Sequence, residues 1–306
     1  MAEVEQEGGR AAELHRASPA RQNRQGIFVC LALKCQLMSR RRQTGWVRST
    51  DPGDYQRVPR AVAAMPKDFV AGFTILPHHH ERAQLIYATT GTMRVATDDG
   101  VWIVPPQRAL WMPAGVTHGI EMLAEVTMRT LYLRDDAASF MPGTCHVLPV
   151  SPLLRELIVR ATELPLQYDE RGPAGHVVAL ILAELRGLQF LPLRLPMPRD
   201  PRLRTVCQAL LDRPGDVRPL DDWAPLANLS ARTLARRFQR ETGMSFGGWR
   251  QQARVLAAMG RLGAGEPVTR IALDLGYESV SAFSAMFRRA AGTSPSEFRH
   301  RQPASR

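Results

Sequence analysis

A repeat in the last third of the chain constrains its fold more than any other feature of the sequence. The segment FQRETGMSFGGWR, residues 238–250, aligns with FRRAAGTSPSEFR, residues 287–299, at an offset of 49 residues. The matched pairs are Phe238 and Phe287, Arg240 and Arg289, Gly243 and Gly292, Ser245 and Ser294, Trp249 and Phe298, Arg250 and Arg299, Ser230 and Ser279, and Leu234 and Phe283. Repetition of this kind predicts two copies of one supersecondary unit.

Each copy has the pattern of a helix, a turn and a second helix. In the first copy, Ser230 is placed to cap a helix over 231–242, on which Leu234 and Phe238 lie four residues apart on one face. Gly243 is placed to end that helix. The second copy repeats these signals at the same offset, and a long helix is expected between the two copies.

The charge of the chain is concentrated near its C-terminus. Residues 199–306 carry 18 basic and 10 acidic side chains, residues 51–198 carry 13 and 15, and residues 1–50 carry nine and four. A basic domain beside a nearly neutral one favours a polyanionic partner such as nucleic acid. Four scattered cysteines without CxxC spacing, and no apolar run of about 20 residues, favour a reducing cytoplasm and no membrane span.

These residues carry a family resemblance. Residues 200–302 resemble the DNA-binding domain of AraC-type (AraC/XylS family) transcription regulators. The residues that carry it are Ala224, Ser230, Leu234, Phe238, Gly243, Arg254, the segment IALDLGY at 271–277, Phe283, Phe287, Arg288 and the segment GTSPSEFR at 292–299. The resemblance implies two helix-turn-helix units that read two successive major grooves of double-stranded DNA.

The outward positions of the two recognition helices differ in chemistry. Arg232 and Arg236 lie on the face opposite the apolar residues, where both could reach guanine. The full set of expected base-reading residues is Arg232, Thr233, Arg236, Ser281 and Ser284, and the expected phosphate contacts are Arg237, Arg240, Arg288 and Arg289. Because the outward positions of the second copy are short and uncharged, that copy is expected to read bases weakly, or only through the thymine methyl group and the backbone.

The middle of the chain has a different pattern. Residues 55–133 contain short runs of β-forming residues separated by glycine and proline, with a hairpin signal at 98–100, which predicts a small barrel or jelly roll. Residues 151–190 change to a helical period, with Leu153 expected on the buried face of the first helix. The proline-rich stretch 191–201 is expected to be a linker.

Residues 65–134 resemble a cupin barrel. Gly72, His78, His80, Gln84 and Gly91 have the spacing of the first cupin motif, with Gln84 where the motif usually has Glu. The second motif is matched by Pro113, Gly115 and His118, whereas Gln107 and Met122 stand where it usually has Gly and Asn.

The resemblance implies that His78, His80, Gln84 and His118 meet inside the barrel, where they could hold a divalent transition metal. The neutral Gln84 would weaken such a site, so a metal-free pocket with polar walls stays open as the alternative. His79 is expected to face solvent. The other candidate wall residues of an effector pocket are Leu76, Trp102, Trp111 and Met128.

The expected architecture is α+β with two domains. Residues 1–50 are expected to be a disordered N-terminal extension, with Met38 as an alternative start, and residues 51–150 to form the cupin-like effector domain. Residues 151–198 are expected to form connecting and dimerisation helices with a proline-rich linker, and 199–306 the all-α double helix-turn-helix domain. The expected protein is a homodimeric cytoplasmic transcription regulator that binds DNA and a small-molecule effector and is not an enzyme. The rival functions are a metal-dependent cupin enzyme fused to a DNA-binding module and a structural nucleoid protein.

Overall fold

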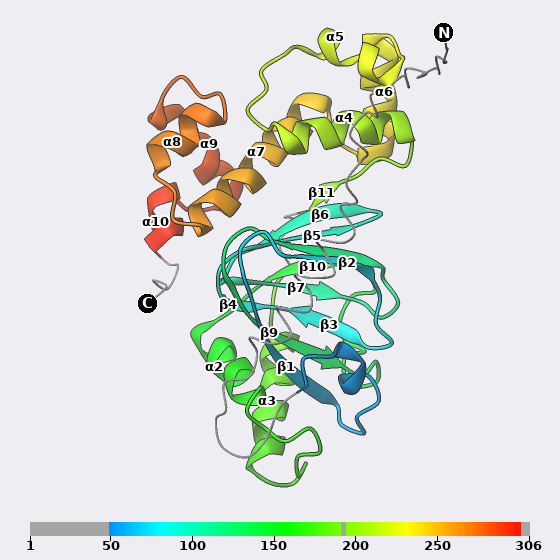
Figure 1. Cartoon of the computed structure of the whole chain (residues 1–306), viewed down its shortest axis with the longest axis vertical. Helices are drawn as coiled ribbons and strands as arrows, with labels where there is room; N and C mark the ends of the chain where they lie inside the picture. Colours follow the sequence, from blue (N-terminus) through cyan, green and yellow to red (C-terminus); the bar gives the residue numbers. More distant parts are fainter. Residues whose placement is uncertain (1–48, 191–193, 301–306) are drawn as a thin grey trace, which may run out of the picture. The chain divides into compact units, whose positions relative to one another are not determined.

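The structure, a computed structural model, describes residues 49–190 and 194–300 of the 306-residue chain. The expected N-terminal extension and the alternative start at Met38 therefore lie almost entirely outside the described residues. The described chain forms an antiparallel β domain followed by an all-helical domain, which confirms the predicted α+β class (Figure 1).

Two antiparallel sheets form the β domain. The first has the order β1-β9-β3-β7-β10, with β4 also paired to β9, and the second has the order β11-β6-β5-β8-β2. The strands of the first sheet are β1 (Val62–Phe69), β3 (Ala83–Ile86), β4 (Ala88–Thr90), β7 (Arg108–Met112), β9 (Val126–Leu133) and β10 (His146–Pro149). Those of the second are β2 (Thr74–His78), β5 (Met93–Thr97), β6 (Gly100–Val104), β8 (His118–Met122) and β11 (Leu195–Pro196). A short 3-10 helix, η1 (Pro52–Tyr55), precedes them.

Two turns of the β domain follow directly from local sequence. The predicted hairpin connects β5 and β6, with Ala96 opposite Val101 and Met93 opposite Val104. Gly91 has a φ of +77°, and a Cβ there would lie 2.1 Å from the backbone oxygen of Glu125. Only glycine fits this turn, both for its conformation and for the close approach of the backbone.

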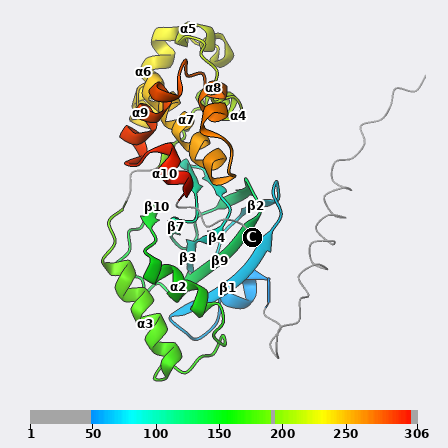
Figure 2. The same cartoon turned by 90° about the vertical axis from the view of Figure 1, so that its left-hand side faces the viewer.

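The first sheet is covered on both faces. Leu110 and Met112 of β7 pack into the cluster that lies between the sheets, whereas the alternate residues Ala109 and Trp111 pack against the connecting helices. These helices are α2 (Pro152–Ala161) and α3 (Pro173–Arg186), which lie beside this sheet in both views (Figures 1 and 2). Ser151 caps α2, because its Oγ accepts a hydrogen bond from the Leu154 amide at 3.0 Å.

Two expectations for the connecting segment were wrong. Leu153 is 51% exposed, because α2 buries the stripe formed by Leu154, Leu157 and Ile158 instead. The proline-rich stretch is not only a linker, since Leu195 and Pro196 form β11 and pair with Val101 and Gly100 of β6. Proline is compatible with this position because β11 is an edge strand.

The helical domain contains the predicted repeat. Its first unit places α6 (Ala231–Thr242) after α5 (Leu220–Trp223) and the 3-10 turn η2 (Pro225–Ala227), and its second unit places α9 (Val280–Ala291) after α8 (Val268–Asp274). The long helix α7 (Phe246–Gly263) connects the units, α4 (Pro201–Asp212) precedes them, and α10 (Pro295–His300) follows them. The two recognition helices α6 and α9 begin and end at an offset of 49 residues.

Caps and aromatic contacts recur at the same offset. Ser230 and Ser279 cap α6 and α9, and both helices end at a glycine with a left-handed backbone, at φ +73° for Gly243 and +75° for Gly292. The ring centroids of Phe238 and Trp249 are 5.7 Å apart, and those of the matched pair, Phe287 and Phe298, are 5.6 Å apart. Each unit therefore has its own aromatic core.

In the parts of the chain that the structure describes, no helix combines the length and the apolar character that crossing a bilayer requires.

Candidate functional site

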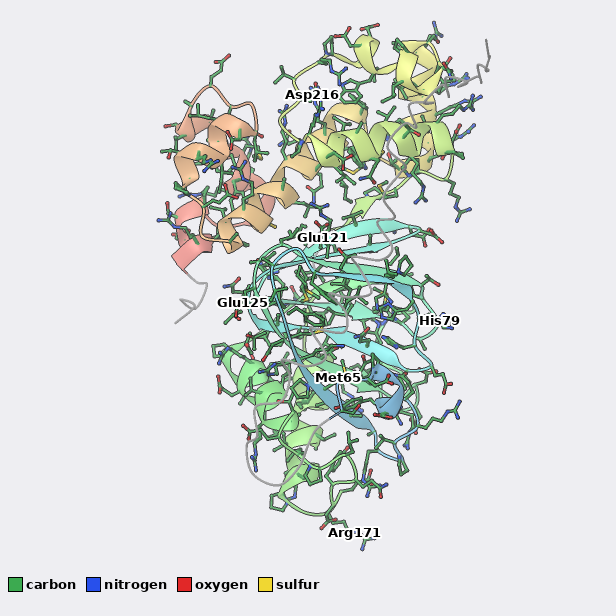
Figure 3. All side chains as sticks on the ribbon, in the orientation of Figure 1. Met65, His79, Glu121, Glu125, Arg171 and Asp216 are labelled. Atoms are coloured by element: carbon green, nitrogen blue, oxygen red, sulfur yellow. The ribbon has the colours of Figure 1, made fainter. Side chains whose placement is uncertain are left out.

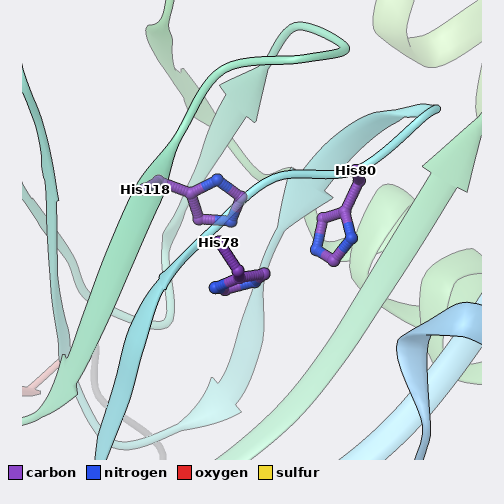
Figure 4. Close-up of side chains that lie close together, drawn as sticks. All are labelled: His78, His80 and His118. Carbon is purple, nitrogen blue, oxygen red and sulfur yellow. The ribbon is translucent and has the colours of Figure 1, made fainter.

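Three histidine side chains gather in the β domain (Figure 4). His78 ends β2 and pairs across the sheet with His118, the first residue of β8, while His80 follows in the connection to β3. The ring centroids are 4.5 Å apart for His78 and His118, 4.8 Å for His78 and His80, and 5.5 Å for His80 and His118. The sheet pairing thus brings together the three histidines that the sequence grouped.

Hydrogen bonds to the backbone fix the rings of His78 and His118 and leave the second nitrogen of each available as a ligand. Nδ1 of His78 lies 2.8 Å from the Leu76 carbonyl oxygen, and Nδ1 of His118 lies 2.9 Å from that of Val116. A carbonyl accepts, so Nδ1 carries the proton and Nε2 keeps its lone pair. In the described chain, Nε2 of His80 and Nε2 of His118 are buried without a hydrogen-bond partner.

Burial also sets the charge of two of these rings. It lowers the pKa of His118 to about 4, and it lowers the pKa of His80 to about 4 together with the neighbouring His78 and His118. At neutral pH both imidazoles are therefore uncharged, which is the form that binds a metal ion. His79, as expected, is exposed at the edge of the β domain (Figure 3).

Two residues that the sequence did not single out, Thr130 and Tyr132, connect Gln84 with the histidine cluster. Gln84 Nε2 donates to Thr130 Oγ1 at 3.0 Å and to Tyr132 Oη at 3.4 Å, and the Tyr132 ring centroid lies 5.0 Å from that of His80. Gln84 Oε1 is buried and, within the described chain, has no hydrogen-bond partner. Alternation along β9 places Thr130 and Tyr132 on the same face as Met128, and this alternation is the signal that could have identified them.

The candidate wall residues do not all lie together. Trp102 and Met128 are buried in the cluster between the sheets, as expected for a pocket or a core. Trp111 is a correction: it packs on the other face of its sheet, against α2 and α3, and its Nε1 donates to the Pro142 carbonyl at 2.8 Å. Leu76 is a second correction, because it is 76% exposed on the edge strand β2.

The histidine cluster fits a divalent transition metal by its donor set and its spacing. One ligand nitrogen from each of the three rings lies within 4.8 Å of the others. A metal with bonds of about 2.0–2.1 Å to nitrogen holds its ligands no more than about 4 Å apart, so small ring rotations would close the site. Two buried Nε2 atoms and a buried amide oxygen have no hydrogen-bond partner among residues 49–190 and 194–300, and a metal ion would satisfy such atoms, which are costly when left unpaired.

The first recognition helix presents the predicted arginines to solvent. Arg232 and Arg236 are exposed on α6, while Leu234 and Phe238 on the opposite face are fully buried. Thr233 is partly engaged in the helix cap, because the Ser230 hydroxyl lies 2.9 Å from Thr233 Oγ1. The arginines are therefore free to reach base edges from this helix.

The second recognition helix has a different outward face. Ser281 and Ala285 are exposed and Ser284 is half-buried, opposite the fully buried Phe283 and Phe287. The base-reading asymmetry between the two copies therefore has the geometry that the sequence predicted, whereas its effect on DNA binding stays a prediction.

The candidate phosphate contacts fall into two groups. Arg288 and Arg289 are exposed near the end of α9, and Arg240 is exposed with its guanidinium 3.9 Å from Glu241. Arg237 instead forms an ion pair with Asp200 at 3.2 Å. Its charge is compensated within the protein, so Arg237 is the weakest of the four candidates for holding DNA.

Comparisons with known proteins agree with both domains. The family model described as "AraC-like ligand binding domain" matches residues 71–213, and the one described as "Helix-turn-helix domain" matches residues 223–301. The chain is 34% identical over 221 residues to the HTH-type transcriptional regulator NimR of Escherichia coli (strain K12), which covers 72% of this chain and 81% of that protein.

Two further likenesses cover shorter stretches. The Arabinose operon regulatory protein of Escherichia coli (strain K12) is 29% identical over 171 residues, covering 52% of this chain and 54% of that protein. Among solved structures, the C-terminal domain of AraT, a response regulator from Geobacillus stearothermophilus, is 28% identical with a TM-score of 0.32, covering 34% of this chain and 88% of that one.

These findings decide between the rival functions. The matched relatives are named as transcription regulators, and the two matched models describe a ligand-binding domain and a helix-turn-helix domain. The chain is therefore a DNA-binding transcription regulator rather than a cupin enzyme. It belongs to the AraC-type family of transcription regulators.

Proposed function

We propose that this regulator is controlled by a small-molecule effector, and that a divalent metal held by His78, His80 and His118 takes part in binding it. The histidine cluster carries this proposal: three imidazoles from two paired strands and the following turn converge, and two of them bury an Nε2 without a partner in the described chain. Bound there, a metal would supply a Lewis-acidic centre for an oxygen or nitrogen donor of the effector.

The residues around the cluster have separate tasks in this proposal. The carbonyls of Leu76 and Val116 fix the rings of His78 and His118 through Nδ1. Gln84 offers a neutral oxygen where a carboxylate would otherwise compensate the metal charge, so the charge stays available to an anionic or strongly polar effector. Trp102 and Met128, both buried between the sheets, would supply the apolar wall of the proposed effector site.

The test begins with the operator, which can be recovered as the fragments of its own genome that the protein retains. The purified protein is expected to carry close to one Zn, Ni, Fe or Mn per chain, measured by elemental analysis. The His80→Ala/His118→Ala double variant is expected to carry none, because it removes two of the three imidazoles. Adding the metal to stripped protein should change operator affinity by roughly 5- to 150-fold in the wild type only, the usual range for coupled sites.

A neighbouring histidine provides the matched control. His79→Ala removes an imidazole from the same turn, but this ring is exposed and lies outside the cluster. It should therefore retain both the metal and the change in affinity. A wild-type protein that stays metal-free after incubation with each of the four ions would decide against the metal and leave a pocket with polar walls as the effector site.

We also propose that two chains pair through α3. The helix buries Val178, Ile181 and Leu185 against the first sheet, yet Leu180 on its outer side is 50% exposed beside the exposed Ala179. Exposed apolar side chains on a helix that is already packed on its other face favour a contact between subunits.

Sedimentation of the full-length chain checks this pairing. The wild type is expected to have the mass of two chains at micromolar concentration, and Leu180→Glu the mass of one, because a charge would be buried in the contact. Leu226→Glu changes a leucine that is 47% exposed in the helical domain and should leave the mass unchanged. A wild type that sediments as a single chain would remove the idea. We propose that the paired chains act in the cytoplasm, where the DNA is.

A further inference from the structure

A basic cavity lies between α7 and the second recognition helix. Its volume is about 360 Å³, and its wall includes Arg250 and Arg254 of α7, Tyr277, and Arg289 of α9. None of the described residues that line it is acidic. Arg289 and Ala282 at its edge are exposed, so the cavity is open to the surface.

The two inner arginines are held in place without being neutralised. Arg254 donates to the carbonyl oxygens of Pro214 and Asp216 at 2.9 and 3.0 Å, and Arg250 donates to that of Arg218 at 2.6 Å. These acceptors are neutral backbone groups. The carboxylate of Asp216 is occupied by Arg218 at 2.8 Å.

Within the described chain no carboxylate forms an ion pair with either guanidinium, although the nearby Asp216 offsets part of the charge of Arg250. Burial, and then the like charge of Arg254, lower the pKa of Arg250. An anion in the cavity would relieve this repulsion. A guanidinium held from behind by carbonyls still offers its remaining N–H groups in a fixed fork, which matches the oxygens of a phosphate.

The cavity also adjoins the face of α9 that carries the expected base-reading positions. Its α9 residues, Ala282, Met286 and Arg289, form one stripe at spacings of four and three residues. The expected base-reading positions Ser281 and Ser284 lie on the adjoining face of the same helix. A helix that enters a major groove has backbone phosphates on both sides of it, so this stripe would face one of the two strands.

We propose that the cavity holds one phosphate of the DNA backbone beside the groove that α9 enters, with Arg250, Arg254 and Arg289 as its ligands. The second unit would thus bind DNA mainly through this phosphate, which compensates for its short base-reading side chains. The proposal depends on the DNA-binding function of the family and is independent of the metal, so failure of one leaves the other standing.

The test uses Arg250→Gln and Arg289→Gln in the full-length protein. Each variant is expected to lower the slope of log affinity against log salt by about 0.9, the value for one lost phosphate contact, on operator and scrambled DNA alike. Arg171→Gln removes the same charge from an exposed site in the connection between α2 and α3 and should leave the slope unchanged (Figure 3). Equal slopes for Arg250→Gln, Arg289→Gln and Arg171→Gln would overturn the proposal.

A second measurement identifies the phosphate. Operators with a single uncharged methylphosphonate are scanned one position at a time. At one position beside the second half-site, the methylphosphonate should lower the affinity of the wild type. At that same position it should not lower the affinity of Arg289→Gln any further, because the contact is already absent from this variant. Losses that multiply at every position would contradict the contact. Arg289 is exposed, so its variant keeps the test valid if Arg250→Gln fails to fold.

The same chemistry could serve a free phosphorylated molecule, and a third measurement separates the two sources. Inorganic phosphate and a nucleoside monophosphate at millimolar concentration are expected to leave the melting temperature of the wild type unchanged, because DNA is the ligand. A rise in the wild type that is absent in Arg250→Gln, together with unchanged salt slopes, would assign the cavity to a free ligand and overturn the proposal.

Discussion

Replacing Arg236 by alanine is expected to reduce affinity for the specific operator by about 10- to 100-fold, since a bidentate arginine–guanine pair contributes roughly 1–3 kcal/mol of discrimination. Arg236 is exposed on α6, opposite the buried Leu234 and Phe238, so its guanidinium is free to enter the groove. Base preference should be relaxed in only one half of the operator, and the loss of affinity should be much smaller on scrambled DNA. Binding titrations on matched and scrambled operators at two salt concentrations measure both quantities.

The second unit supplies the comparison. Ser284→Ala changes a short, half-buried side chain of α9 and is expected to change little. Arg289→Ala should lower specific and non-specific affinity together, because a phosphate contact carries no sequence information. If Ser284→Ala cost more discrimination than Arg236→Ala, α9 would be the main reader and the assignment of the two helices would be reversed.

Replacing Phe238 by alanine is expected to lower the free energy of unfolding of the helical domain by about 3–5 kcal/mol, the usual cost of removing a fully buried aromatic ring. Phe238 has no exposed surface, and its ring contacts those of Phe246 and Trp249 at centroid distances of 5.4 and 5.7 Å. Its deletion leaves a cavity that the rigid helix pair cannot close. Denaturant unfolding, followed together with loss of operator binding, measures the change.

The duplicated unit predicts a matched result. Phe287→Ala should cost a similar amount, because Phe287 is equally buried between Phe283 and Phe298. Leu273→Ala alters an apolar side chain of the same domain that is 66% exposed, and its effect should stay within about 0.5 kcal/mol. A Phe238→Ala protein as stable as Leu273→Ala would show that the two aromatic cores are not what holds the units together.

The helical domain could be predicted from the sequence because its signals are local. Caps at Ser230 and Ser279 and stops at Gly243 and Gly292 each act within one turn of their own helix. The signals of the first copy occur again 49 residues later, so the two copies support each other. Helix boundaries and the exposure of Arg232 and Arg236 followed from this short-range physics.

The β domain could be predicted less completely because the local sequence of a strand does not determine which distant strand it pairs with. The run RALWM of β7 is apolar on both faces, since one face meets the second sheet and the other meets α2 and α3. Alternation alone could not say which face Trp111 takes. The contact of Gln84 with Thr130 and Tyr132 joins residues 46 and 48 positions apart, and only the register of β3 against β9 brings them together.

The pairing of β11 with β6 limits how far the DNA-binding domain can travel. Leu195 and Pro196 are part of the second sheet, and the Met197 amide donates to the Asp99 carbonyl at 3.0 Å, whereas α4 begins at Pro201. Only residues 198–200 lie between this contact and α4, a span of about 10 Å when fully extended, and the amides of Arg199 and Asp200 themselves donate to Glu241 of α6 at 2.9 Å. Two paired chains with tethers this short could span only a narrow range of operator spacings, and the β6–β11 contact would set that range.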